Sequence, residues 1–135
     1  MTMKTIALIA GAAFLMTSPV LAHHSFSMFD HDKTVTISGT VKEFEYTNPH
    51  AWLHVMAADE KTGKPTEWSF EMGGVGQVAQ QGWKPDTVRP GDKISVEMHP
   101  LKDGSHGGQY LGATLADGRS FKNPGAPPVN QNVAR

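Results

Sequence analysis

Five short segments of alternating apolar and polar residues, a short helical segment between the third and the fourth, and a bend in the first predict the fold. The order β-β-β-α-β-β predicts an all-β domain with one short helix, a small five-stranded OB-like barrel with Greek-key connections. A β-sandwich fits less well, because it usually has about seven strands. Closing the sheet also removes strand edges that a short chain has little material to cover.

The first predicted strand begins near Thr34 and bends in its middle. Its apolar side chains fall at odd positions from 35 to 41 and then at even positions, Phe44 and Tyr46. Because side chains alternate between the two faces of a strand, this change of parity beside Gly39 predicts a bulge or a sharp coil. The segment 47–49 (TNP) predicts a turn.

The second and third strands are predicted as a hairpin over residues 51–58 and 66–72, with a loop between them. One face of the second strand carries Trp52, His54 and Met56, and the other carries Leu53 and Val55. The sequence leaves open which of these is the core face. The third strand is predicted to point Trp68, Phe70 and Met72 inward, and Glu67, Ser69 and Glu71 outward as a solvated surface. Trp52, Trp68, Phe70 and Trp83 are interpreted mainly as core, since a barrel buries several large rings.

The remaining elements follow at short intervals. A helical turn is predicted over residues 75–81, with Val78 facing the core and Gly82 ending it. The fourth strand places Ile94, Val96 and Met98 on one face, the loop 103–108 follows, and the fifth strand covers 109–115. After a turn at 117–118, Phe121 is the last residue expected to pack, and residues 122–135 are predicted to be a disordered tail.

Residues 1–22 have the features of a secretory signal peptide. Lys4 precedes an apolar stretch that is too short for a comfortable membrane span, and small side chains lead to a cleavage site after Ala22. We therefore expect export to the periplasm, a histidine-rich lead-in at 23–33, and a barrel domain at 34–121. No membrane span is expected after cleavage.

Composition excludes several classes of function. The chain of 135 residues has no cysteine, which rules out disulfides, thiolate metal sites and cysteine nucleophiles. Its formal net charge is −1, so it lacks the basic excess of a groove that follows a phosphate backbone, and no nucleic-acid partner is expected. No nucleophile arrangement or complete phosphate-loop motif is present, and enzyme activity is not favoured.

The seven histidines suggest a metal site at the mature N-terminus. Cleavage after Ala22 gives His23 a free α-amine, so this residue can chelate an ion through its amine and its ring. His24 or His50 would supply a further nitrogen. Copper has the highest affinity for nitrogen donors among the common divalent ions, and the nearby Met28 and His31 add donors that suit its two oxidation states. The alternative is that the pair is only a polar leader left by cleavage.

The other histidines have simpler interpretations. His50 follows a proline at a turn on the barrel rim, where it is either a ligand or a turn residue bonded to a backbone carbonyl. His54 is either a satisfied core residue or, with Trp52, part of a surface patch. His99 is predicted to point outward, and His106 lies in a glycine-rich loop too mobile for a preorganised ligand.

Several motifs occur in an order that resembles a known family of small exported bacterial proteins of unknown function. They are the mature start 23–26 (HHSF), the segments 47–52 (TNPHAW) and 68–72 (WSFEM), and, further on, 82–83 (GW) and 89–92 (RPGD). The resemblance covers roughly residues 22 to 121 and implies one exported domain. It implies no activity, ligand or catalytic residue.

The sequence therefore predicts an exported small protein that binds copper for carriage or buffering. The alternative is a metal-free binding module that holds a protein or an oligomeric ligand on the Trp52 face and the loop 104–108. The identity of any protein partner is open.

Overall fold

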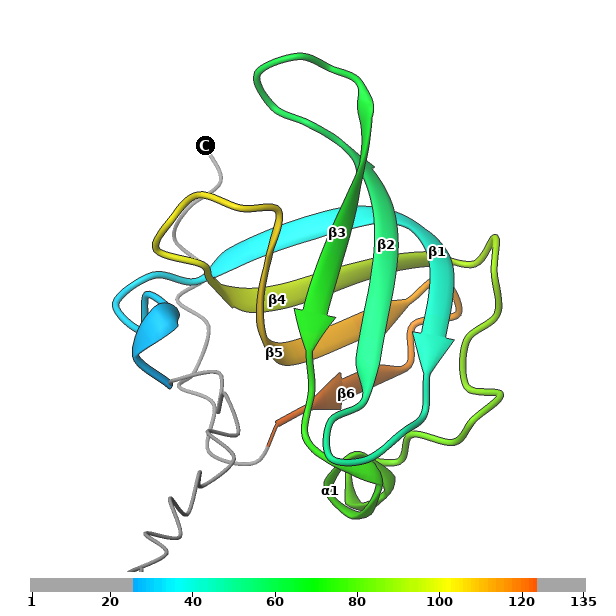
Figure 1. Cartoon of the computed structure of the whole chain (residues 1–135). Helices are drawn as coiled ribbons and strands as arrows, with labels where there is room; N and C mark the ends of the chain where they lie inside the picture. The colour runs from blue at the N-terminus through cyan, green and yellow to red at the C-terminus, as the bar shows by residue number, and fades with distance from the viewer. Residues whose placement is uncertain (1–25, 124–135) are drawn as a thin grey trace, which may run out of the picture.

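The computed structural model describes residues 26–123, which form a closed barrel with one helix at its end (Figure 1). The strands are β1 (Val35–Glu45), β2 (Trp52–Ala58), β3 (Pro65–Glu71), β4 (Lys93–Pro100), β5 (Gly107–Leu115) and β6 (Ser120–Lys122). A 3-10 turn, η1 (Phe26–Met28), precedes them, and the helix α1 (Val75–Gln80) lies between β3 and β4.

The strand pairings close the barrel in the OB topology. The sheet order is β3-β2-β1-β4-β5-β6, and a parallel pairing of β3 with β5 joins the two ends of the five-stranded ring. The predicted fold class is therefore confirmed. The short β6, which pairs only with β5, was not predicted, because three residues with one apolar side chain give too short a pattern.

The long first strand belongs to both halves of the barrel. Residues 35–40 pair with β4 and residues 40–45 pair with β2, and the register shifts between Val41 and Glu43. This is the bulge that the change of parity predicted. Gly39 lies where the strand turns, and a Cβ there would come within 2.2 Å of the Met56 carbonyl oxygen. The close approach of β2 to β1 therefore requires glycine at this position.

The core fills the barrel with side chains from all its strands and from α1. Fully buried members include Leu53, Val55, Phe70, Val78, Trp83, Val96, Met98 and Tyr110. Burying one such aliphatic or aromatic side chain contributes about 1.5–3 kcal/mol. The core face of β2 is the one with Leu53 and Val55, so Trp52 lies outside, and its assignment to the core was wrong.

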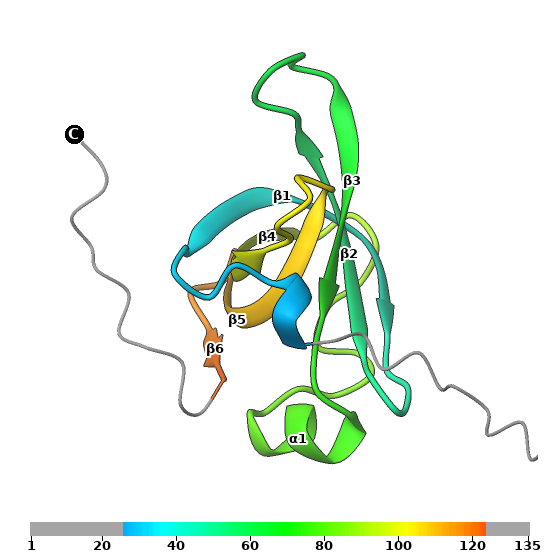
Figure 2. The same ribbon diagram turned by 60° about the vertical axis from the view of Figure 1, so that its left-hand side comes forward.

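The helix α1 covers one end of the barrel, opposite the protruding β2–β3 loop (Figures 1 and 2). Asn48 Oδ1 accepts a hydrogen bond from the Val75 amide at 2.9 Å, which ties the β1–β2 turn and its cis Asn48–Pro49 bond to the start of the helix. Val78 is the buried residue of α1, as predicted, and Gly82 ends it with a φ of +99°.

The segment before β1 packs along the outside of the barrel, beside β4 and β5 (Figure 2). Phe29 is buried and forms a bridge with Leu101, while the Asp30 amide donates to the Pro100 carbonyl and the Lys102 amide to the Met28 carbonyl. This docked segment was expected only as a polar lead-in. Within residues 26–123, no helix has the length and apolar character needed to cross a membrane.

Candidate functional site

One row of outward-facing side chains runs around the barrel from strand to strand. The register pairs Glu45 with Trp52, Trp52 with Glu71, Glu71 with Gln109, and Gln109 with His99. Directly paired residues project from the same face of a sheet. We call this row the belt: Glu45, Trp52, Glu71, Gln109 and His99. It brings polar and aromatic groups of five strands onto one continuous surface.

His50 stands beside the belt, in the turn that leads into β2. Its Nδ1 lies 3.0 Å from the Met72 carbonyl oxygen and 3.3 Å from Oε1 of Glu71. A carbonyl oxygen can only accept, so Nδ1 carries the proton and the neutral ring has its lone pair on Nε2. The side chain of His50 is 46% exposed, whereas that of Glu71 is 11% exposed. The turn histidine bonded to a backbone carbonyl is thus the observed arrangement.

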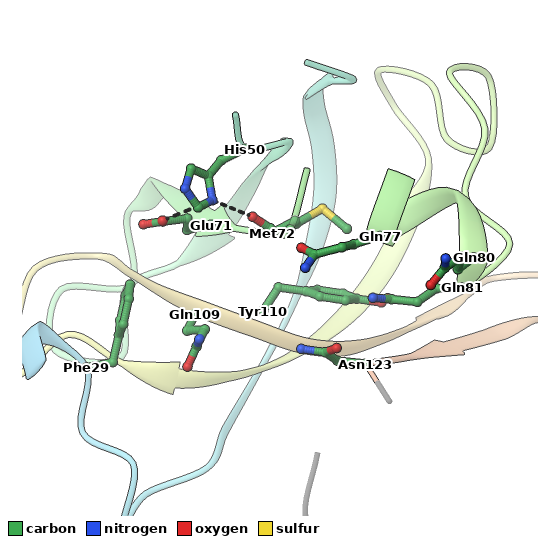
Figure 3. Close-up of a pocket in the computed structure, with 11 residues that line it drawn as sticks. Phe29, His50, Glu71, Met72, Gln77, Gln80, Gln81, Gln109, Tyr110 and Asn123 are labelled. Atoms are coloured by element: carbon green, nitrogen blue, oxygen red, sulfur yellow. Dashed lines mark hydrogen bonds and ion pairs between the residues drawn. The ribbon is translucent and has the colours of Figure 1, made fainter. Parts of the chain in front are cut away.

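A cavity of about 410 Å³ opens next to His50 and Glu71 (Figure 3). Phe29 of the N-terminal segment and Gln109 of the belt line one part of it, and Tyr110 and Asn123 another. Gln77 and Gln80 enter from α1, and Gln81 enters from the cap at its C-terminal end. Oε1 of Gln81 is buried and finds no hydrogen-bond partner within the described part of the chain. The lining combines amides with one carboxylate and one imidazole, and it contains no lysine or arginine.

The outer face of β1–β3 carries a second polar group, centred on His54. Its Nε2 lies 2.9 Å from Oε1 of Glu45, and its Nδ1 lies 2.9 Å from Oγ of Ser69 and 3.3 Å from Oε1 of Glu67. Lys42 pairs with Glu67, and this hydrogen bond lowers the pKa of that carboxyl. His54 therefore belongs to the surface patch rather than to the core. Because carboxylates occupy both of its nitrogens, it is poorly placed to bind a metal.

The side chains of Glu67, Ser69 and Glu71 point outward as predicted, but they are not simply a solvated surface. Glu67 and Ser69 hold His54, and Glu71 is the partly covered neighbour of His50.

His106 links two loops at the opposite end of the barrel from α1. Its Nε2 donates to Oδ2 of Asp59 at 2.8 Å, and its ring meets the edge of Trp68, with ring centres 4.8 Å apart. The hydrogen bond from His106 is the largest cause that lowers the pKa of Asp59 to about 2. The glycine-rich loop predicted to be mobile is thus fastened to the β2–β3 loop.

His99 leaves the barrel on its outer side, but only 6% of it is exposed, because the segment before β1 covers it. Its Nδ1 donates to the Lys33 carbonyl at 2.7 Å. The ring of His31 lies edge-on to it, with centres 4.9 Å apart. His31 also contacts Phe29, at 6.4 Å between ring centres.

The structure places only some of the predicted metal ligands. His23 and His24 lie outside the described residues. Met28 is partly buried in η1, His31 lies against His99, and His50 lies at the cavity. Within residues 26–123, no three histidine, aspartate or glutamate side chains gather in a group that could hold an ion. A three-ligand site at His50 would therefore need donors from the N-terminal residues.

Sequence reasoning missed Glu71, the glutamines of α1 and the pairing of His31 with His99. Glu71 could have been predicted, because a hairpin centred on the loop 59–64 places residue 71 opposite Trp52, next to the turn that holds His50. The glutamines and the His31–His99 contact depend on how α1 and the N-terminal segment dock, which no local pattern encodes.

Comparisons with known proteins give a family but no activity. One similar solved structure is that of Rim1, a mitochondrial single-stranded DNA binding protein from S. cerevisiae. It shares 14% sequence identity and has a TM-score of 0.47, with 62% of this chain and 93% of that chain covered. No protein of curated function matches the sequence.

A family model matches residues 12–110, which is most of the chain and includes the turn with His50, the β2–β3 hairpin and α1. The chain belongs to DUF6152, a family of unknown function.

Proposed function

We propose that this chain is an exported periplasmic protein that binds a copper ion at its mature N-terminus for carriage or buffering. Cleavage after Ala22 gives His23 a free amine, which chelates the ion together with its ring, and His24 or His50 supplies the next nitrogen. Met28 and His31 are peripheral donors. In this proposal the protein is not an enzyme.

The observation that carries the proposal is the state of the His50 ring. A histidine that binds a metal through one nitrogen usually donates its other N–H to a carbonyl or carboxylate, which fixes the ring and the tautomer. His50 has this arrangement, because Nδ1–H points to the Met72 carbonyl and to Glu71 while Nε2 keeps its lone pair. The nearly covered Glu71 carboxylate also favours a cation nearby.

The position of the N-terminal segment supports the proposal that His50 and His23 bind the same copper ion. Phe29 lines the same cavity as His50, and residue 23 lies six positions before it. Six extended residues reach about 20 Å, so the chain length permits contact between the two. The nitrogen donors of such a site favour copper over zinc or nickel.

The test is a Cu(II) titration monitored by EPR, on secreted protein whose intact mass shows a start at His23. We expect His23→Ala and His50→Ala each to weaken binding by about tenfold or more, which is about 1.4 kcal/mol, and to change the nitrogen hyperfine pattern. His106→Ala is the matched control, since that ring is 41% exposed and bonded to Asp59. A chain that starts at Ser25 or later, or a spectrum indifferent to both substitutions, overturns the proposal.

A second candidate function is a metal-free module that binds a protein or an oligomeric ligand. The cavity beside the belt supports it, since about 410 Å³ lies within the range of ligand pockets and the buried Gln81 oxygen has no hydrogen-bond donor among residues 26–123. Trp52 does not line the cavity, but it is partly exposed and pairs across the hairpin with Glu71, which does, so its fluorescence would report occupancy. Quenching of tryptophan fluorescence by a ligand without added metal, lost in Trp52→Phe, would favour this module over the copper protein.

A further inference from the structure

We propose that the cavity beside Glu71 binds a small polar molecule that carries a primary amine, of the chemical class of the amino sugars. This inference rests on the second candidate function above and deepens it, because it names the class of ligand that the cavity takes. It concerns the metal-free protein and uses neither His23 nor His24.

The carboxylate of Glu71 is the group that would hold the amine. Its side chain is 11% exposed, and its one ion-pair partner within residues 26–123 is His50, whose Nδ1 lies 3.3 Å from Oε1. The neutral imidazole shares its single N–H between this carboxylate and the Met72 carbonyl oxygen, which lies at 3.0 Å. The negative charge of Glu71 therefore stays uncompensated in a largely covered position, where a cation nearby is favourable.

The surroundings of Glu71 suit an ammonium group. No lysine or arginine of the described residues lines the cavity, so the cation has to come from the ligand. Gln109 is paired with Glu71 in the parallel contact between β3 and β5, and it lines the cavity beside that carboxylate (Figure 3). An ammonium group has three N–H donors and no acceptor, while carboxylate and side-chain amide oxygens both accept. The two side chains together can therefore take an ammonium group.

The rest of the lining selects the body of the ligand. Phe29 and Tyr110 offer aromatic rings that can pack against C–H groups. Gln81 and Asn123 add side-chain amides, which can bind hydroxyl groups as donor or as acceptor. Oε1 of Gln81 is buried and has no donor among residues 26–123, and a ligand hydroxyl would supply one. With a volume of about 410 Å³, the cavity has room for more than the amine itself. Several hydroxyls and one ammonium group on a compact carbon ring match this set.

The test compares glucosamine with glucose, which has a hydroxyl where glucosamine has its ammonium group. Each sugar is titrated into the secreted protein with EDTA at pH 7, where an amine is mostly protonated. NMR follows the backbone amides of Glu71 and Gln109 and the side-chain amides of Gln81 and Asn123. We expect glucosamine to shift these resonances with a millimolar Kd, and glucose to bind at least tenfold more weakly.

Two variants locate the amine. Glu71→Gln keeps the shape of the side chain but removes its charge, and we expect it to weaken glucosamine binding at least tenfold and to leave glucose binding unchanged. Glu45→Gln is the matched control, because it removes another carboxylate of the belt, which is 42% exposed and does not line the cavity. It should change the affinity for glucosamine by less than twofold. The comparison of the two sugars on the unsubstituted chain depends on neither variant.

The outcomes separate this inference from the function on which it rests. Equal affinity for the two sugars, or an equal loss in Glu71→Gln and Glu45→Gln, overturns the amine site but leaves the second candidate function standing. If neither sugar shifts the resonances of the lining at 50 times the expected millimolar range, about 50 mM, the inference is overturned as well. The second candidate function is then decided separately, by whether any other ligand quenches the fluorescence of Trp52.

Discussion

At the scale of single residues, Asp59 organises the β2–β3 loop and fastens it to the neighbouring loop. Its Oδ1 accepts from the amides of Lys61 and Thr62 at 2.9 and 2.8 Å, and its Oδ2 accepts from His106. These bonds all favour the ionised carboxylate, which is why the pKa of Asp59 falls to about 2. The folded state therefore holds this carboxyl charged at a pH where the unfolded chain protonates it.

This linkage predicts how stability depends on pH. The pKa of Asp59 is about 2 in the folded chain and about 3.9 in an unfolded one, so its contribution is complete above pH 4 and is lost as the pH falls toward 2. Asp59→Asn should lower stability at pH 6 and flatten its pH dependence between 4 and 2. Urea unfolding at several pH values measures both effects. The neighbouring exposed Glu60→Gln is the control, and identical curves for Asp59→Asn and the unsubstituted chain would contradict the assignment.

The residue scale is also where prediction from sequence was weakest. Alternation showed that Trp52 and His54 share a face, but not that this face lies outside, because both faces of β2 carry large side chains. The turn and its carbonyl partner were foreseen for His50, since a proline precedes it. The partners Glu71 and Ser69 come from another strand, and only the register of the hairpin brings them near.

At the scale of elements, barrel closure depends on the glycines that begin β5. Gly107 pairs with Ser69 in the parallel contact of β5 with β3, and a Cβ at Gly107 would come within 2.5 Å of the Ser69 carbonyl oxygen. A side chain there must push the two strands apart. Gly107 is thus required for close approach rather than for an unusual backbone conformation.

We predict that Gly107→Ala destabilises the barrel by about 1–3 kcal/mol, the usual range for overpacking. Gly76→Ala is the matched control, because Gly76 lies in α1 with open space around its Cβ position and should gain about 0.5–1 kcal/mol from helix propensity. Chemical denaturation of both variants gives the comparison. If both substitutions change the free energy of unfolding by the same amount and in the same direction, the close approach of β3 and β5 at Gly107 is not required for barrel closure.

The elements themselves were largely predictable. The parity change in β1 foretold the bulge at 41–43, and alternation located β2, β3 and β4 to within about a residue or two. These features follow from local side-chain periodicity. The start of β5 was placed two residues late, at 109 instead of 107, because two glycines give no apolar pattern.

At the scale of the whole molecule, the closed barrel and the docked N-terminal segment together determine which side chains line the cavity. The order of elements predicted the barrel, because few topologies accommodate five strands with one helix between the third and fourth. The docking of residues 26–33 was not predictable, since Phe26, Met28 and Phe29 are too few and too closely spaced to give a strand or helix pattern. The cavity depends on that docking, because Phe29 lines part of it.

A copper ion shared by His23 and His50 would join the N-terminal segment to the barrel, which gives a prediction for the molecule as a whole. The amides of Asp30 and Lys102 form the hydrogen bonds that hold the segment to the barrel. If the segment must release the ion before it opens, Cu²⁺ at 100 times its Kd slows hydrogen exchange at these amides by about 100-fold, equivalent to about 2.7 kcal/mol.

Hydrogen exchange, followed by mass spectrometry on the metal-free and the copper-loaded protein, distinguishes His50 from His24 as the next ligand. With His50→Ala, an ion held only by His23 and His24 moves with the segment, so the slowing disappears although copper still binds. The amide of Val41, bonded to the Asp92 carbonyl at 2.8 Å within the barrel, reports any general change in stability. If copper binds but does not slow exchange at Asp30 and Lys102 even in the unsubstituted chain, His50 is not a ligand and the ion is held by the terminal residues alone.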